Sequence, residues 1–496
     1  METKKHFKET YKILRKLDRQ KLSNWMMQSG YYPESYVLPP YFRVDKFQLL
    51  KKEIYQVNKN GTGYKYGVNS SKLLNISFPN SHLTDREFGI IHPSLYHDIV
   101  FNIVKNWDFI VDHLFKGKRK IFSYSFPVPI TSKSKISTKR QERMIYEYIE
   151  MAEKDLLIDS INFKYVVHID IKNFYPSIYT HSIPWALHGH NSRKPKNYSE
   201  FGHKLDKLFH YANDRCTNGI PIGPVVSDLI AEIILSSIDK SVILPKGSFG
   251  VRFKDDYRIL CKTKSEGSQI IKNIQKELKK FNLHINESKT DILELPDGLF
   301  RPWIVEYASY SFRGRKISLK EFGFIYSKVI QINKKYPSKG IIDKFLGEIV
   351  SNDNFDLNVI LKTDKDRKKF ISLVWSLARV RPKSFASILG IIEYFTANLS
   401  LKKYIELFIK NDFIFYSSDD NEDVFMAIWL HYFMKTNCIK AGVLGKKEHD
   451  FWEVLRLGKK RMFSLPLHEK CWSFYEPIKG NKKFGTINEN VILFQG

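Results

Sequence analysis

The sequence has few cysteines, no long apolar run and fewer acidic than basic residues. Its four cysteines lie far apart and form no Cys-x-x-Cys pair, which argues against a disulfide framework or a cysteine-based zinc site and favours a reducing compartment. No apolar run approaches the roughly 20 residues that cross a bilayer, and the basic N-terminus lacks the apolar segment of a signal peptide. We therefore expect a soluble, cytoplasmic protein with no membrane partner.

Basic residues outnumber acidic ones by 80 to 53, which gives a formal net charge of +27. An excess of this size is typical of proteins that act on polyanions, namely nucleic acids, nucleotides or anionic membrane surfaces. Hydrophobic residues make up 43% of the chain, and this content excludes general disorder. A chain of 496 residues is also long enough for two domains.

The first part of the chain is expected to be mainly helical. Residues 1–30 have apolar side chains at spacings of three and four, which predicts a basic amphipathic helix. The stretch 31–42 contains several prolines and excludes helix, and helix is expected again from about 85 to 115.

The pattern then changes twice. Between about 160 and 295, short apolar strands alternate with helical runs, which predicts an α+β core. Beyond about 325 the apolar periodicity is only helical. We expect one domain at residues 1–325 and an all-helical C-terminal lobe at residues 326–496, for which a helical-repeat architecture is one option.

Two separate segments place carboxylates at the ends of predicted strands. Residues 250–261 predict a β-hairpin with Asp255 and Asp256 at its turn, although aspartates are common in turns for structural reasons. Asp170 ends the apolar strand 165–170, where a carboxylate costs desolvation free energy unless it is paired or binds a cation. If the strands are neighbours, the three side chains converge and suit a two-ion Mg²⁺ site, with Mn²⁺ as an alternative.

A Gly/Pro loop at residues 218–224 leads into a predicted apolar helix. Gly219 and Gly223 would allow the backbone to approach a bulky ligand closely, although the loop alone indicates no more than the start of a helix. It is not a P-loop, because no Gly-Lys-Ser/Thr follows.

Taken in order, these segments resemble the palm motifs of reverse transcriptases. FYPSIYTHS follows the first aspartate, GIPIGPVVSD resembles the loop–helix motif, FKDD stands where the family has Tyr-x-Asp-Asp, and LHINESKT resembles the next motif with its lysine. YPSIYTHSIPWALHG and ESYVLPPYF add a closer resemblance to abortive-infection (Abi) polymerases and related defence-associated reverse transcriptases. The resemblance implies a reverse-transcriptase-like palm and fingers followed by the helical lobe.

The resemblance also implies metal-binding and catalytic roles for individual residues. Asp170 and Asp255 would hold the metal ions, and Asp256 would complete the carboxylate cluster. The backbone carbonyl of Ile171 would be a further ligand.

Nucleotide-binding roles are implied for another set of residues. Tyr175 would crowd a ribose 2′-OH, or would instead be a core tyrosine beside a phenylalanine. Lys289 would lie near the departing pyrophosphate, or would instead be one surface lysine among many. The remaining nucleotide-binding candidates are Lys139, Arg140 and Arg143, in a basic run that could equally be solvated, and Gly223.

Several positions depart from the template-copying members of that family. Ile222 occupies the place of a glutamine, Phe253 that of a tyrosine, and Glu232 that of an asparagine, while the charged Lys254 stands in the variable slot. No thumb or RNase H region is recognisable after the palm. These departures put templated copying in doubt.

The leading expectation is a Mg²⁺-dependent DNA polymerase that uses dNTPs. The resemblance implies untemplated synthesis of single-stranded DNA in phage defence by abortive infection, primed by a tyrosine and covalently attached to a homo-oligomeric protein. Candidate primers, chosen by clustering only and equally explained as a structural segment, are Tyr31, Tyr32, Tyr36 and Tyr41. Two alternatives stay open: a template-dependent reverse transcriptase that copies a bound RNA, and a non-catalytic nucleic-acid-binding or toxin module.

Overall fold

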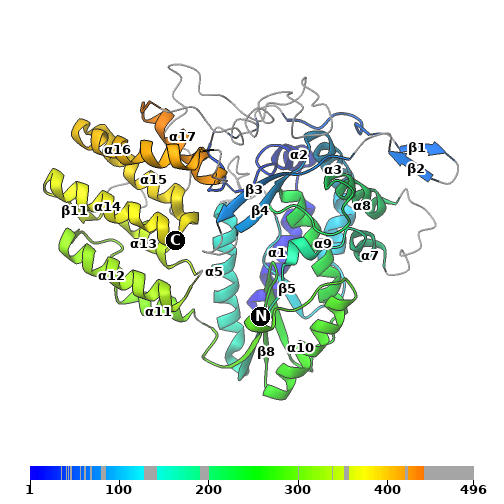
Figure 1. Cartoon of the computed structure of the whole chain (residues 1–496). Coiled ribbons are helices and arrows are strands. Elements are labelled where there is room, and N and C mark those ends of the chain that lie inside the picture. The colour runs from blue at the N-terminus through cyan, green and yellow to red at the C-terminus, as the bar shows by residue number, and fades with distance from the viewer. Residues whose placement is uncertain are drawn as a thin grey trace.

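The computed structural model of the chain consists of an α+β body and a helical lobe that lie side by side (Figure 1). It describes residues 1–440 and Ile487, except for positions 35, 41, 43, 45–46, 56, 61–62, 67–69, 80–84, 128–141, 190–199, 300, 338, 351–356 and 419–422. For residues 57–60, 63–66 and 142–150 the description covers the backbone alone.

A five-stranded sheet lies in the α+β body. Its order is β5 (Ile121–Ser123), β7 (Phe249–Phe253), β8 (Asp256–Cys261), β6 (Tyr165–Asp170) and β9 (Asp291–Glu294). The pair β5–β7 is parallel and the other neighbouring pairs are antiparallel. The predicted alternation of strands and helices between 160 and 295 is therefore confirmed.

The two faces of this sheet are covered by different helices. Val166 and Leu260 pack with residues of α5 (Glu142–Asp159) on one face. Val167 and Ile259 point to the other face, which α10 (Lys264–Lys279) covers. Because side chains alternate along a strand, Asp170 and Asp256 belong to the face that carries α5.

Helix α10 illustrates how the local sequence builds these layers. Its apolar residues Ile270, Ile274 and Leu278 recur every four positions and are fully buried against the sheet. Thr263 and Glu266 form a capping box that satisfies backbone donors at its start.

The remaining elements of the α+β body are mostly helices. They are α1 (Glu2–Arg15), α2 (Arg19–Met27), α3 (Pro93–Lys105), α4 (Trp107–Phe115), α6 (Phe174–Ser177), α7 (Ser182–His188), α8 (Phe201–Ala212) and α9 (Val225–Ser241). Two antiparallel hairpins join them, β1 (Val57–Asn60) with β2 (Gly63–Tyr66) and β3 (Leu74–Pro79) with β4 (Asp85–Ile90).

Two of the helix predictions in this body were wrong in detail. The single helix expected at 1–30 is broken, because Asp18 caps a new helix by accepting a hydrogen bond from the backbone of Lys21. The helix expected from 85 begins only at Pro93. Residues 85–90 instead pair with β3, since Phe88 and Ile90 are buried on that hairpin.

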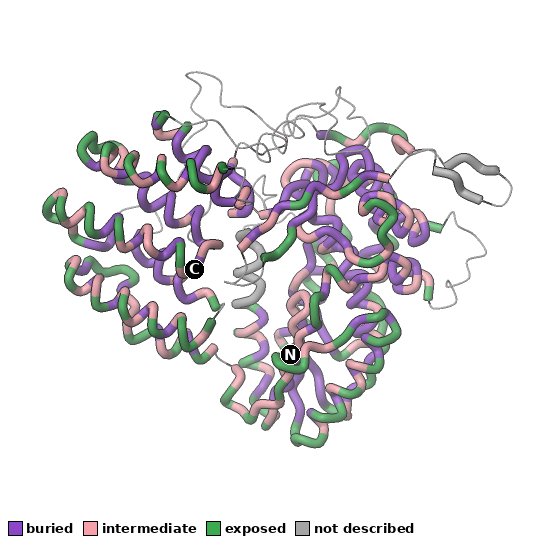
Figure 2. Tube along the Cα trace, viewed as in Figure 1, coloured by how far each residue is buried: buried purple, intermediate pink, exposed green. Residues whose placement is uncertain are grey.

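The helical lobe stacks its helices in two rows. Its elements are α11 (Pro302–Ala308), α12 (Leu319–Lys335), α13 (Ile341–Ile349), α14 (Asp364–Val380), α15 (Phe385–Glu393), α16 (Leu399–Tyr416) and α17 (Val424–Thr436). Helices α13, α15 and α17 form the more buried row, and α12, α14 and α16 carry exposed faces (Figure 2).

The lobe differs in one respect from the all-helical expectation. A short strand, β11 (Val359–Ile360), pairs in parallel with β10 (Ile317–Ser318). The predicted boundary at residue 325 lies inside α12. In the described part of the chain, no helix combines the length and apolarity needed to cross a membrane.

Candidate active site

Strand pairing brings the three predicted aspartates to one end of the sheet. Asp170 is the last residue of β6 and lies directly opposite Asp256, the first residue of β8. Asp255 occupies the two-residue turn between β7 and β8. The backbone N–H of Ile171 donates to the carbonyl of Asp255 at 3.3 Å, which ties the end of β6 to this turn.

The carboxylates repel one another. Burial, followed by the charge of Asp170, raises the pKa of Asp255. Burial and the charge of Asp255 also raise the pKa of Asp256 to about 6, against the opposing effect of Arg258. The Asp256 side chain is 48% open to solvent, so water moderates both effects.

The donor set fits a hard cation that completes its coordination with substrate. In the described residues, no three His, Cys, Asp or Glu side chains are close enough to form a metal site by themselves. Mg²⁺, however, is usually held by one or two carboxylates together with water and phosphate oxygens. The mutual repulsion of Asp170 and Asp255 is the feature that a bound cation would relieve.

Asp170 is held by residues of a later segment. The Lys289 ammonium lies 3.3 and 3.4 Å from its two carboxylate oxygens. Asn286 donates to it twice, from its side chain at 3.1 Å and from its backbone at 2.7 Å to the Asp170 carbonyl. Lys289 is 63% exposed, so its side chain is free to leave Asp170 for an incoming anion.

Tyr175 follows β6 on the short helix α6, after a left-handed residue, Asn173, with φ of 46°. Its hydroxyl donates a hydrogen bond to Asp228 on α9. Its ring also packs against Phe174, with 5.3 Å between the ring centroids, as the core-tyrosine alternative expects, and its contact with a ribose stays a prediction. Burial raises the pKa of Tyr175 well above its usual range, and the hydroxyl therefore keeps its proton.

Lys254 connects this tyrosine to the turn between β7 and β8. Its ammonium lies 3.4 and 3.5 Å from the two oxygens of Asp228. Lys254 directly precedes Asp255 and has a left-handed backbone, with φ of 49°. Sequence reasoning missed the pairing of Lys254 with Asp228, because it appears only when α9 and the hairpin pack together.

The buried side chain of Arg252 stabilises the turn between β7 and β8 through hydrogen bonds. Arg252 donates to both oxygens of Glu232 at 2.8 and 3.0 Å, to Asp239 at 2.9 and 3.0 Å, and to the Lys254 carbonyl at 3.0 Å. Burial opposes the ionisation of Glu232, but Arg252 and two serine hydroxyls outweigh it and hold the pKa of Glu232 below its usual range. Glu232, which stands where template-copying relatives have an asparagine, is thus the ion-pair partner of Arg252.

The glycine loop packs against the N-terminal part of the chain. Gly223 has a φ of 118°, and a Cβ there would lie 2.9 Å from Pro33 and 3.0 Å from Phe88. The backbone N–H of Gly89 donates to the Ile222 carbonyl at 3.0 Å. Close packing therefore accounts for this glycine, and its contact with a nucleotide stays a prediction.

The other candidates lie in different surroundings. Tyr31 is fully buried and donates to the carbonyl of Ile91 at 2.7 Å, and Tyr32 is 3% exposed. Tyr36 is half-buried, with its ring 5.6 Å from Phe78. Arg143 lies in the first turn of α5, with its side chain outside the description. The candidates that fall outside the described residues are Lys139, Arg140 and Tyr41.

Comparison with known proteins adds a family match. Residues 123–324 match the family described as reverse transcriptase (RNA-dependent DNA polymerase), a segment that contains all three aspartates. No curated protein matches the chain.

Solved structures that resemble the chain include fungal telomerases. Apo telomerase from Candida tropicalis truncated from its C-terminal domain has 16% identity and a TM-score of 0.24. The match covers 32% of this chain and 36% of that one. The corresponding apo telomerase has 13% identity and a TM-score of 0.32, covering 76% of this chain and 71% of that one. Telomerase from Candida albicans in complex with a fragment of telomeric RNA has 12% identity and a TM-score of 0.23, covering 59% and 53%.

Proposed function

We propose that this chain makes single-stranded DNA from dNTPs. Residues 123–324 carry a reverse transcriptase domain, which supports a nucleotidyltransferase of the RNA-directed DNA polymerase kind. The observation that carries the proposal is the pairing of Asp170 with Asp256 beside Asp255 in the hairpin turn. Burial and mutual repulsion raise the pKa of Asp255 and of Asp256, and a bound cation would offset this cost.

The proposed reaction is the attack of a hydroxyl oxygen on the α-phosphorus of a dNTP, with pyrophosphate as the leaving group. Asp170, Asp255 and the Ile171 carbonyl would hold Mg²⁺, or Mn²⁺ in its place, and Asp256 would complete the carboxylate cluster. The bound ions would stabilise charge on the attacking and leaving oxygens. Lys289 would move from Asp170 to the departing pyrophosphate, and the Tyr175 ring would crowd a ribose 2′-OH.

We further propose that synthesis needs no template and begins on a tyrosine of the protein, in phage defence by abortive infection. The support is the sequence resemblance to Abi polymerases together with Ile222, which stands where template-copying relatives have a glutamine. Tyr36 is the best placed of the described primer candidates, since Tyr31 and Tyr32 are buried.

The same resemblance supports a homo-oligomer. We also propose two domains, predicted at residues 1–325 and 326–496, with the second, of helical-repeat type, starting at α11 rather than inside α12. The stacked pairs of helices from α12 to α17 are consistent with that architecture. Cys216, Cys261 and Cys438 are free cysteines, which fits a reducing compartment. We therefore propose that the protein acts in the cytoplasm.

The test is incubation of the purified protein with labelled dATP and Mg²⁺ in the absence of nucleic acid, followed by denaturing electrophoresis. We expect label that migrates with the protein and is released by nuclease. Asp170→Asn and Asp255→Asn should each reduce incorporation by more than about a hundredfold, since even outer-shell partners of metal ligands are worth about 10- to 100-fold. Asp291→Asn, on β9 of the same sheet, is the matched control and should retain activity.

The other outcomes separate the parts of the proposal. Label found only in free DNA would contradict protein priming, and a product that follows an added template would contradict untemplated synthesis. Full incorporation by Asp255→Asn would contradict the polymerase assignment itself.

A further inference from the structure

The side chain of Asp228 joins the tyrosine of the proposed sugar site to the catalytic turn. It accepts a hydrogen bond from the Tyr175 hydroxyl and lies 3.4 Å from the Lys254 ammonium. Asp228 is 14% exposed and Lys254 is 27% exposed, so water competes weakly for either contact. Because Lys254 is the residue before Asp255, two side chains, those of Asp228 and Lys254, connect the tyrosine to the metal-binding turn.

This connection restricts how the Tyr175 ring can move. Its hydroxyl is fixed by a carboxylate, and such charge-assisted hydrogen bonds are about twice as strong as neutral ones. The Phe174 ring contacts it edge-on at 5.3 Å, and the Lys254 ammonium lies 6.0 Å from its centroid. The ring is therefore held at its tip, at its edge and near its face.

The other end of the connection is also rigid. The backbone N–H of Lys254 donates to Ser125 at 2.8 Å, and its carbonyl accepts from the buried Arg252 at 3.0 Å. Lys254 thus holds Asp228 from a backbone that is itself fixed on both sides.

We propose that Asp228 and Lys254 are positioning residues that hold the Tyr175 ring where it excludes a ribose, and that they thereby set the preference for dNTPs over rNTPs. This inference rests on the proposed function, in which Tyr175 faces the sugar. A ring that loses its anchor can rotate away from the 2′-OH, so an intact aromatic side chain is not sufficient for discrimination. Neither Asp228 nor Lys254 needs to touch the nucleotide.

The experiment compares kcat/KM for dATP with kcat/KM for ATP in the full-length chain. Tyr175→Phe removes only the hydroxyl, and Asp228→Asn removes the charge from the other side of the same bond. We expect each to lower the dATP/ATP ratio by about tenfold, in line with the loss of one hydrogen bond to a charged group. The double variant should resemble either single variant rather than show the product of the two effects.

Two further variants set the scale. Tyr175→Ala removes the ring and should lower the ratio most, whereas Lys254→Met should lower it by about threefold, since it weakens only the support of Asp228. The matched control is Tyr326→Phe, which removes a hydroxyl bonded at 2.6 Å to Ser376 in the helical lobe. It should leave the ratio unchanged.

The outcomes distinguish this inference from the proposed function. A wild-type ratio in both Tyr175→Phe and Asp228→Asn, with a lowered ratio in Tyr175→Ala, would overturn the positioning role and leave the proposed function intact. A wild-type ratio in Tyr175→Ala would overturn the sugar contact and the inference together. If Asp228→Asn does not fold, Tyr175→Phe alone decides, because it keeps the ring and its packing.

Discussion

In the candidate site, the carboxyl groups of Asp255 and Asp256 lie in surroundings that disfavour their ionised forms. Asp255 and Asp256 both have raised pKa values, so their ionised forms cost the folded protein free energy. Arg252, in contrast, is surrounded by carboxylates and the Lys254 carbonyl, and it stabilises the turn that carries these aspartates. The site thus combines carboxylates that repel one another at the end of the sheet with a buried arginine whose charge is paired with carboxylates.

The first prediction concerns the free-energy cost of the ionised Asp256 carboxylate. Asp256→Asn should stabilise the metal-free protein at pH 8 by about 1 kcal/mol after allowance for solvent exposure, or roughly 2 °C in Tm. A folded-state pKa of about 6, above the usual 3.8, means that the cost is present above pH 6. It should decline as the pH falls from 6 and vanish below about pH 4, where both states bind the proton.

Thermal unfolding in EDTA across this pH range measures the effect. The exposed Asp291→Asn serves as the control and should change Tm little at any pH. A lower Tm for Asp256→Asn at pH 8 would contradict the electrostatic argument.

Residues of the site were predictable where their role is local in sequence. Asp170, Asp255 and Asp256 could be placed because strand and turn patterns reveal carboxylates at strand ends. Asp228 and Asn286 could not, since their contacts with Tyr175 and Asp170 span 53 and 116 residues of sequence. Such contacts depend on packing, which one sequence does not display.

At the scale of elements, helix α10 supports the sheet behind the candidate site. Its three buried apolar residues each contribute about 1.5–3 kcal/mol of burial free energy, and its capping box anchors the first turn to the end of β8. The start of this helix is therefore expected to limit local opening near the sheet.

The second prediction tests that cap. Thr263→Ala should lower the stability of α10 by about 1 kcal/mol, seen as a roughly fivefold loss of amide protection in hydrogen exchange. Ser268→Ala, a hydroxyl removed from the exposed face of the same helix, is the matched control. Equal protection in the two variants would show that the capping box is unimportant.

Element types were predicted better than element limits. The strands β6, β7 and β8 were recognisable from their alternation and turn residues. The strand β4 was not, because its apolar residues Phe88 and Ile90 run directly into a helix of similar composition. The end of the α+β body was likewise hidden, since α12 crosses residue 325 without a proline or glycine-rich break.

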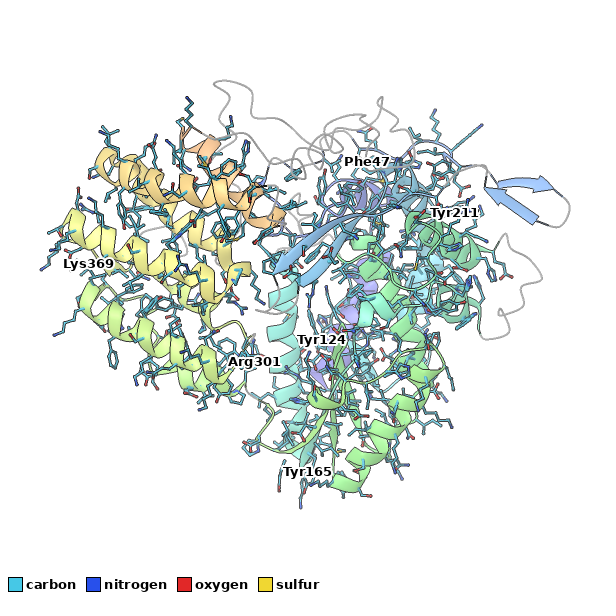
Figure 3. All side chains as sticks on the ribbon, viewed as in Figure 1. Phe47, Tyr124, Tyr165, Tyr211, Arg301 and Lys369 are labelled. Atoms are coloured by element: carbon cyan, nitrogen blue, oxygen red, sulfur yellow. The ribbon has the colours of Figure 1, made fainter. Side chains whose placement is uncertain are left out.

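On the scale of the whole molecule, basic side chains lie on both bodies. Lysines line the outer face of α10 at residues 272, 276 and 279, with Lys280 at its C-cap, and Lys369 lies on α14 at the outer side of the helical lobe (Figure 3). A polyanion would therefore be attracted by either body, independently of its sequence.

We predict a steep salt dependence of single-stranded DNA binding. If the protein neutralises about four phosphates, the affinity should fall by roughly 50-fold between 50 and 200 mM salt. Fluorescence anisotropy with an oligonucleotide measures this, and an uncharged peptide nucleic acid of the same base sequence is the control. A salt-independent affinity would contradict an electrostatic role for the surface lysines.

The contact between the two bodies also bears on how such a protein can evolve. Phe425 of α17 packs on Phe78 of β3 at 5.0 Å, and Trp429 donates to the carbonyl of Val37 at 3.3 Å. These side chains belong to one continuous apolar core, so a chain ending at residue 325 would leave an exposed apolar surface on the α+β body. The two bodies are therefore expected to be inherited together and to tolerate neither separation nor exchange with unrelated partners.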